Sequence, residues 1–407
     1  MVTRTLWLIL ALLVASITIN YIDRGTLAVA AATVPFQREM RFSDTDLGLL
    51  FSAFFWAYAT LQVGAGYFID RYGVVRVYTA GFILWSAATV ATGFAGGFAS
   101  LLALRLLLGA GEAVAYPAYA KIIASGYPEE RRGTANALID AGSRTGAALC
   151  VLVGGAIAAH SGWRAMFFLI GGAGLLWLAP WLLFAARVPA ARATPKSRGP
   201  GLCAILRRRE AWGTFFGLFC VNYTWNFLLS WLPSYLTRER HYTTGMMAVY
   251  GSLPFWGVAL TCAVFGIVSD RMIARGSSPT RVRIGFVSGG MLLSTLMLPA
   301  CLISNQVLSM ALLVVACLSL GLTSSNFWAI TQTLAGPRAA GQWAGLQNGI
   351  GNLAGIVGPY LTGYIVAKTG AFLPAFLSAC LMSVAGACSY IFIVRRVAPL
   401  DWGDRAL

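Results

Sequence analysis

The chain has 407 residues, of which 58% are hydrophobic and only 11% are charged. A soluble domain carries about 25% charged residues, so this composition excludes a soluble globular protein and indicates a membrane protein with many spans. The net charge of +16 does not indicate a nucleic-acid partner, because most basic residues lie in short loops between apolar runs.

The first apolar run begins after Arg4 and continues to Val34. It passes the ionisable neighbours Asp23 and Arg24, and it has no convincing A-x-A cleavage site. A signal peptide would have a shorter apolar region that ends at such a site. We therefore predict that this run is the first membrane helix.

Similar apolar runs follow along the whole chain, divided by glycine, proline and clusters of charge. Their lengths fit the roughly 20 residues that a membrane helix needs. The sequence predicts an all-α membrane protein with twelve spans. These lie near 5–34, 46–69, 75–95, 99–124, 133–158, 163–186, 211–236, 247–269, 282–303, 307–334, 341–367 and 372–395.

Basic residues are unequally shared between the loops. The loops after even-numbered spans, together with both tails, carry 20 of the 30 Lys and Arg residues, and the opposite loops carry 6. Cytoplasmic loops are enriched in Lys and Arg, so we predict that both termini are cytoplasmic. The longest loop, 187–210, is basic and rich in Pro and Gly, which indicates a linker between two six-helix halves. A contact with anionic lipids is compatible with the same composition.

The two halves share a spaced motif. A glycine followed four residues later by Asp-Arg closes span 2 at Asp70 and Arg71, and it returns 200 positions later at Asp270 and Arg271. Parallel repeats of six spans are typical of one transporter architecture. We therefore predict two pseudo-symmetric bundles of six helices, 1–186 and 211–407, joined by the linker 187–210.

The fourth span, 99–124, contains Arg105 and Glu112. Seven residues are close to two helical turns, so both side chains lie on one face, roughly 10 Å apart. An ionised group at membrane depth is costly unless it is paired or faces a wet cavity. One interpretation is a structural ion pair between helices; the other is a polar face that lines a central cavity for a charged solute.

Several motifs carry a resemblance to a known family. The segment GYFIDRYGVVR (66–76) resembles the loop 2–3 motif of the major facilitator superfamily, and NYIDR (20–24) resembles a signature of its anion:cation symporter family. That family includes bacterial galactonate, glucarate and hexuronate carriers and is related to sialin and the vesicular glutamate transporters. Further similar segments are 105–122, 127–137, 222–236, 325–336 and 340–363.

The resemblance implies roles for particular residues. It places functional positions of the family at Arg24, Arg105 and Glu112, and a proton-linked position at Asp23. It also implies that the loop motifs clamp the helix ends in one transport state and release them in the other. The gating residues would be Asp70, Arg71, Arg76, Asp270 and Arg271.

The chemistry of these charges suggests how an anion and H+ could be coupled. Protonation of Asp23 or Glu112 would leave an arginine without its partner, and that arginine could hold a substrate carboxylate through two hydrogen bonds. We expect Arg24 to bind the anion. Arg105 would either bind substrate or tune Glu112, and Asp23 could instead be a fixed partner of Arg24 or Arg105.

Other polar and aromatic residues are candidates for substrate binding, each with a plain structural alternative. The tyrosines could simply pack, and the amides could hydrogen-bond between helices. Asp140 and Arg144 depart from the family pattern: they could pair at i, i+4, or Arg144 could recognise a second anionic group. The candidates are Tyr21, Tyr58, Arg144, Asn222, Tyr223, Asn226, Trp328 and Asn348.

We predict a proton-coupled importer of an organic anion, a sugar acid or another carboxylate, in the bacterial inner membrane. An anion exchanger or exporter is the alternative, and a ligand sensor of transporter-like fold is a further one. No nucleophile–base constellation, metal-ligand spacing or P-loop occurs in the sequence, so we expect neither an enzyme nor any metal or cofactor beyond H+. The expected partners are the small anion and membrane lipids, with no nucleic acid, for a monomeric carrier.

Overall fold

The structure is a computed structural model that describes residues 4–188 and 200–402, and this part of the chain contains helices and no strands. Most of the predicted linker 187–210 lies outside the described residues. The helices are α1 (Arg4–Ala31), α2 (Val34–Met40), α3 (Asp44–Tyr72), α4 (Val74–Thr92), α5 (Phe98–Glu112), α6 (Ala115–Gly126), α7 (Glu129–Leu149), the π-helix η1 (Cys150–Gly154), α8 (Gly155–Leu176), α9 (Leu178–Ala185), α10 (Leu202–Leu206), α11 (Arg209–Arg238), α12 (Thr244–Ala274), α13 (Pro279–Ser294), α14 (Met297–Leu302), α15 (Gln306–Thr369), α16 (Leu373–Cys388) and the π-helix η2 (Ser389–Val394).

All twelve predicted spans coincide with helical segments. Among the described residues, nine helices are long and apolar enough to cross a membrane, and the bent pair Asp44–Gln62 and Gly64–Tyr72 makes ten. One of the nine, Thr134–Ala185, holds two predicted spans that meet at Gly162. The remaining span is α11, whose asparagines lower its hydropathy. The predicted all-α membrane class is confirmed.

Helix breaks follow from proline and glycine in the sequence. Pro117 has no backbone N–H to offer the carbonyl of Ala113, and its ring clashes with that carbonyl. The fourth span is therefore interrupted directly after Glu112, between α5 and α6. At Gly336, a φ of +63° lets α15 turn from span 10 into span 11, a conformation that favours glycine.

The chain divides into two compact units. The first unit contains Met1–Ala193, Leu229–Leu253 and Pro359–Lys368, and the second contains the remaining residues. The predicted boundaries at 186 and 211 stay a prediction. We describe each unit separately.

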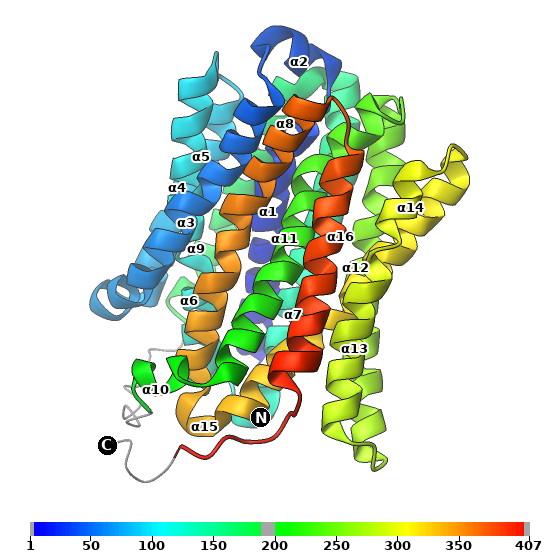
Figure 1. Ribbon diagram of the computed structural model, residues 1–407. Coiled ribbons are helices and arrows are strands. Elements are labelled where there is room, and N and C mark those ends of the chain that lie inside the picture. The colour runs from blue at the N-terminus through cyan, green and yellow to red at the C-terminus, as the bar shows by residue number, and fades with distance from the viewer. Residues whose placement is uncertain (1–3, 189–199, 403–407) are drawn as a thin grey trace. The chain divides into compact units, whose positions relative to one another are not determined.

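Glycines bring the helices of the first unit into close contact. A Cβ on Gly109 of α5 would lie 2.2 Å from the carbonyl oxygen of Phe54 in α3, and one on Gly146 of α7 would lie 2.4 Å from that of Thr18 in α1. Small residues allow such close approach of backbones. The helices α1, α3, α4 and α5 can be followed in Figure 1. Glycines of spans 4 and 5 therefore lie at helix contacts.

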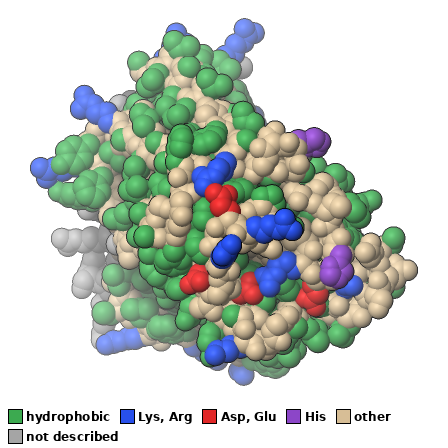
Figure 2. Space-filling model, turned by 90° about the horizontal axis from the view of Figure 1, so that it is seen from above, with side chains coloured by type: hydrophobic (Ala, Val, Ile, Leu, Met, Phe, Trp, Pro, Cys, Tyr) green, Lys and Arg blue, Asp and Glu red, His purple; other side chains and the backbone are tan. Residues whose placement is uncertain are grey.

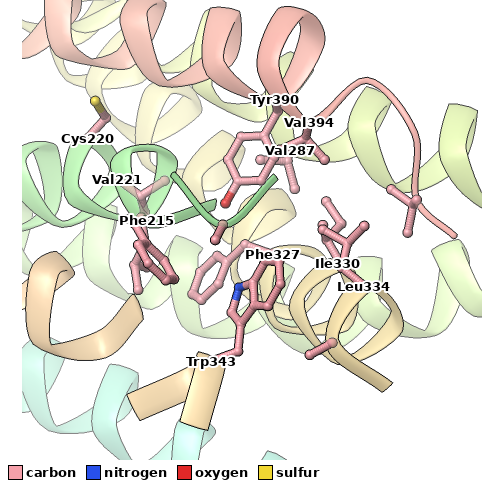
Figure 3. Packing of buried hydrophobic residues seen from close by; sticks show 14 of the residues in the cluster. Phe215, Cys220, Val221, Val287, Phe327, Ile330, Leu334, Trp343, Tyr390 and Val394 are labelled. Carbon is pink, nitrogen blue, oxygen red and sulfur yellow. The ribbon is translucent and has the colours of Figure 1, made fainter. Parts of the chain in front are cut away.

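The second unit has its own apolar core. The ring of Phe215 meets the indole of Trp343 edge to face, with 6.1 Å between centroids, and Figure 3 shows these side chains with Tyr390 above them. The Trp343 indole N–H donates a 2.9 Å hydrogen bond to the hydroxyl of Thr214. A buried tryptophan needs such a partner for its polar edge. The core therefore ties α11 to α15 within this unit.

Large apolar side chains are exposed in many parts of the chain. Phe94, Leu183 and Val307 each keep at least three quarters of their surface exposed. Figure 2 shows one end of the molecule, where Lys, Arg, Asp and Glu side chains gather in a group. Exposed apolar surface on this scale marks contact with a membrane rather than with water.

Candidate functional site

The centre of the first unit holds a buried ion pair between α1 and α5. The Nε of Arg24 donates a hydrogen bond to Oε2 of Glu112 at 2.7 Å, and the side chains keep only 8% and 0% of their surface exposed. Taking two charges out of water is costly, and the pair is stable only with good geometry and further hydrogen bonds. Two expected functional residues, 88 positions apart, therefore meet directly.

Aromatic rings surround the guanidinium of Arg24. Its Cζ lies 4.7 Å from the ring centroid of Tyr21, 4.7 Å from that of Phe54 and 4.6 Å from that of Tyr58. A guanidinium over an aromatic face is stabilised by the negative electrostatic potential of that face, which arises from the quadrupole of the neutral ring. These contacts hold the plane of the guanidinium in place while it keeps its hydrogen-bond donors at the edge.

Arg105 does not pair with Glu112 among the described residues. Its Nε donates to the carbonyl of Leu50 and its Nη1 to the carbonyl of Arg24, both at 3.3 Å. The interpretation of an ion pair between helices is therefore met for Glu112 by Arg24 of α1, and the role of Arg105 stays a prediction. Two helical turns separate these residues on one helix, whereas Arg24 reaches Glu112 from a neighbouring helix. Arg105 instead connects α3 and α5 to the backbone of α1.

Asp23 is completely buried, and neither of its carboxylate oxygens has a hydrogen-bond partner within residues 4–188 and 200–402. Thr89 of α4 lies nearby, but its hydroxyl donates to the carbonyl of Trp85. The alternative that Asp23 is a fixed partner of Arg24 or Arg105 is therefore wrong. Adjacent residues on a helix point about 100° apart, so Asp23 cannot share the direction of Arg24.

Two pairs lie within single helices, and of these only Asp140 with Arg144 was predicted. Oδ1 of Asp140 and Nη2 of Arg144 are 3.9 Å apart on α7, where the Asp140 side chain is 41% exposed and the Arg144 side chain 16%. The side-chain amide of Gln62 donates to the hydroxyl of Tyr58 at 3.1 Å. Pairing at i, i+4 is thus realised for both, while the substrate roles of Tyr58 and Arg144 stay predictions.

The remaining polar candidates lie in the second unit and already make hydrogen bonds there. Asn222 donates to the carbonyl of Gly351 at 3.0 Å, and Asn226 donates to the carbonyl of Asn222 at 2.8 Å. The Tyr223 hydroxyl lies 3.1 Å from that of Ser378. These bonds fit the structural alternative. The substrate roles of Asn222, Tyr223 and Asn226 stay predictions.

Two further candidates in the second unit lie on α15. Trp328 packs beside Phe327 at the edge of the apolar core, with 5.1 Å between ring centroids. Asn348 is half-buried and follows the fully buried Gln347. The substrate roles of Trp328 and Asn348 stay predictions.

Both copies of the loop motif place their aspartate in an ion pair. Asp70, at the end of α3, pairs with Lys121 of α6, and Asp270, at the end of α12, pairs with Arg283 of α13 at 3.0 Å. Arg283 also donates to the side chain of Asn326 at 3.2 Å. The repeated aspartates therefore have cations on different elements.

The arginines of the loop motif lie at the surface. Arg71 donates to the hydroxyl of Tyr67 at 2.9 Å, and the side chains of Arg76 and Arg271 are exposed. The gating role of all these residues stays a prediction.

Sequence reasoning missed three side chains at these places. Phe54 stacks on Tyr58, with ring centroids 5.3 Å apart and planes at 22°, and it also contacts Arg24 and Arg105. Gln347 accepts a 2.5 Å hydrogen bond from Thr331 in the second unit. Asn20 is fully buried in the first unit. Phe54 could have been found in the sequence, because it lies one helical turn before Tyr58. Asn20 could have been found as well, because it is the first residue of the NYIDR segment.

The chain is similar to known proteins over nearly its whole length. A model of the Major Facilitator Superfamily matches residues 13–359. The D-galactonate transporter of Escherichia coli O6:H1 (strain CFT073) is 29% identical over 419 residues, covering 97% of this chain and 96% of that protein. The hexuronate transporter of Bacillus subtilis (strain 168) is 31% identical over 409 residues, covering 95% and 94%.

A solved structure resembles this fold closely. The crystal structure of a bacterial homologue of the human lysosomal transporter Spinster matches with a TM-score of 0.80 and covers 95% of this chain and 96% of its own. The two sequences are 21% identical. A likeness at this level of identity supports the arrangement of the helices alone.

Proposed function

This chain belongs to the major facilitator superfamily, and from that premise we propose that it imports an organic anion together with H+ by alternating access. It is an integral membrane transporter and not an enzyme, because the family model and the similar proteins are those of transporters. The substrate class that we propose is a sugar acid. The named substrates of the two similar transporters, galactonate and hexuronate, combine a carboxylate with several hydroxyl groups.

The observation that carries this proposal is the buried Arg24. Its Nη2 has no hydrogen-bond partner in the described part of the chain, although its Nε is held by Glu112. A guanidinium has five N–H donors in a planar fork that fits a carboxylate. A substrate carboxylate would take the free edge of the fork, and protonation of Glu112 would release Nε to complete a two-bond contact.

Asp23 supports the coupling to H+. A buried carboxylate without a partner costs far more than a neutral carboxylic acid in the same place. We propose that Asp23 carries the transported proton in the state described here. When this proton moves to Glu112, the Glu112 carboxyl group releases Arg24. Asp23 and Glu112 are close enough to interact electrostatically, so the charge of one affects the other.

The remaining assignments complete the proposal. We propose that the protein lies in the bacterial inner membrane with both termini in the cytoplasm, on the basis of the unequal distribution of Lys and Arg between the loops. The carrier would work as a monomer with H+ as its coupling ion and no other cofactor. An exchanger or exporter of the same anions is the alternative, and the experiment below separates it from the importer.

The proposal is tested by substrate binding and uptake in proteoliposomes. The panel contains D-galactonate, D-glucuronate, D-glucarate, succinate and benzoate, and it compares the wild type with Arg24→Ala. Loss of a buried charged partner costs about 2–5 kcal/mol, so we expect sugar-acid affinity to fall at least ~30-fold. Arg187→Ala, which removes an exposed arginine near the linker, is the matched control and should leave affinity unchanged.

Three results would contradict parts of this assignment. Unchanged sugar-acid binding by Arg24→Ala would remove Arg24 from the site. Uptake that requires an anion inside the vesicles, whatever the pH gradient, would identify an exchanger. Binding of a sugar acid with neither uptake nor exchange would identify a sensor.

A further inference from the structure

A second group of polar side chains, Asn20 and Asp23, lies near Glu112. These two residues are not part of the substrate contact proposed for Arg24. Asn20 and Asp23 are both 0% exposed, whereas their neighbours Tyr21 and Arg24 are partly exposed. Residues three apart share one face of a helix, so Asn20 and Asp23 face the same way, into the interior of the first unit. The side chain of Asn20 also lies beside the carboxyl group of Glu112.

These groups are buried without hydrogen-bond partners. Both the Oδ1 and the Nδ2 of Asn20, both oxygens of Asp23 and the Oε1 of Glu112 lack a partner anywhere in the described ranges. Nearly all buried polar groups of proteins are hydrogen-bonded to protein atoms or to ordered water. Five unpartnered atoms on three neighbouring side chains therefore indicate that something polar binds between them.

The mixture of donors and acceptors identifies the missing partner. A cation would satisfy the oxygens of Asn20, Asp23 and Glu112, but it would leave the N–H donors of Asn20 unpaired. Water both donates and accepts, and buried water typically makes about three hydrogen bonds to otherwise unsatisfied groups. The set of atoms thus fits water better than a sodium ion.

We propose that Asn20, with water bound around its amide, relays the proton between Asp23 and Glu112. The amide accepts a hydrogen bond from one side and donates on the other, so it can orient a short water chain between the two carboxyl groups. The O–H bond on one carboxyl group breaks as an O–H bond forms on water, and the water passes a proton to the other carboxylate. Asn20 itself keeps its protons and acts as a positioning residue.

This inference rests on the proposed function, since it gives the coupled proton a route inside the first unit. The route leaves the edge of the Arg24 guanidinium to the substrate. Proton transfer and substrate binding would then meet only at Glu112, whose Oε1 has no partner among the described residues and whose Oε2 holds Arg24. Removing the relay should slow proton movement without weakening the hold on the anion.

The first test separates uptake from exchange in proteoliposomes, with the sugar acid that shows the largest uptake in the panel above. Asn20→Leu replaces the amide with an apolar group of similar size. We expect proton-driven uptake to fall about tenfold or more, because positioned proton transfer typically contributes at least that factor, and exchange at equal pH to stay within about twofold. Asn20→Ser, which can still bind water, should restore most of the uptake.

Thr26→Val is the matched control, because Thr26 is buried on the same helix and its hydroxyl donates to the backbone carbonyl of Asp23. We expect this variant to behave as the wild type in both assays. If Asn20→Leu does not fold, Asn20→Val replaces it. Proton-driven uptake retained by the apolar variant, or uptake and exchange lost together, would overturn the relay.

A second measurement does not depend on transport. Infrared difference spectra of the purified protein follow the carboxyl C=O bands as pH changes, and Asp23→Asn and Glu112→Gln assign the two bands. We expect the two bands to change at the same rate after a pH jump in the wild type and at different rates in Asn20→Leu. Equal rates for the two bands in both proteins would overturn the relay even if the proposed substrate class were wrong. Protons displaced by Na+ at constant pH and ionic strength would show a cation site instead.

Discussion

Arg24 combines three features that no other described arginine is seen to combine. It is almost fully buried, it donates to a carboxylate, and aromatic rings stack on it from α1 and α3. The sequence predicted functional roles for Arg24 and Glu112 but did not predict that they pair. It indicated Arg105 as the neighbour of Glu112 because both lie in one span. Contact between helices, not spacing along one helix, decided the pairing.

Neutral substitutes for the two buried acids test the coupling at the residue scale. Glu112→Gln cannot hold Arg24 as a charged partner, so it should bind the sugar acid at pH 8 as well as the wild type does at pH 6. Asp23→Asn cannot carry a proton, so it should lose accumulation driven by a pH gradient. Uptake and binding measured from pH 5 to 8 give both results. Steep pH dependence in both variants would contradict the assignment.

At the scale of the helices, breaks and close contacts position the site. The interruption after Glu112 follows from Pro117, and the contact of α5 with α3 follows from Gly109. The cage around Arg24 needs this contact, because α3 supplies Phe54 and Tyr58. A sequence reader can place Pro117 and Gly109 on their helices, but cannot tell which neighbour the glycine faces.

Gly109→Ala tests the contact between α3 and α5. The new Cβ would lie 2.2 Å from the Phe54 carbonyl oxygen, so the two helices must separate. Overpacking of this kind costs about 1–3 kcal/mol, and we expect a melting temperature lower by several degrees and weaker anion binding. Gly172→Ala is the control, since a Cβ there meets nothing within 4 Å. It should be neutral or slightly stabilising. Equal melting temperatures for the two variants would contradict the packing.

At the scale of the whole molecule, the repeat predicted from Asp70 and Asp270 is a repeat of sequence more than of contacts. Asp70 pairs with Lys121, whereas Asp270 pairs with Arg283 near the start of α13. Ion pairs depend on where long side chains can reach after the helices pack, so a repeated motif does not fix its partner.

Membrane orientation is also a property of the whole chain. The loops and tails with 20 basic residues should stay in the cytoplasm, because their charges resist translocation. A green fluorescent protein fused after residue 407 should therefore fluoresce in Escherichia coli, and alkaline phosphatase fused there should be inactive. The reverse pattern would place the termini outside. A fusion in the loop between spans 1 and 2 is the control and should behave oppositely.

The sequence by itself determined the order and approximate limits of the helical spans, because apolar length and Gly or Pro breaks are local properties. It also predicted which ionisable residues lie within the apolar spans. Only the tertiary structure decided that Glu112 holds Arg24, that Arg105 binds backbone carbonyls, and that Asp23 and Asn20 stay without partners in the described chain. Such pairing depends on directions of side chains from different helices, which one helix's sequence cannot specify.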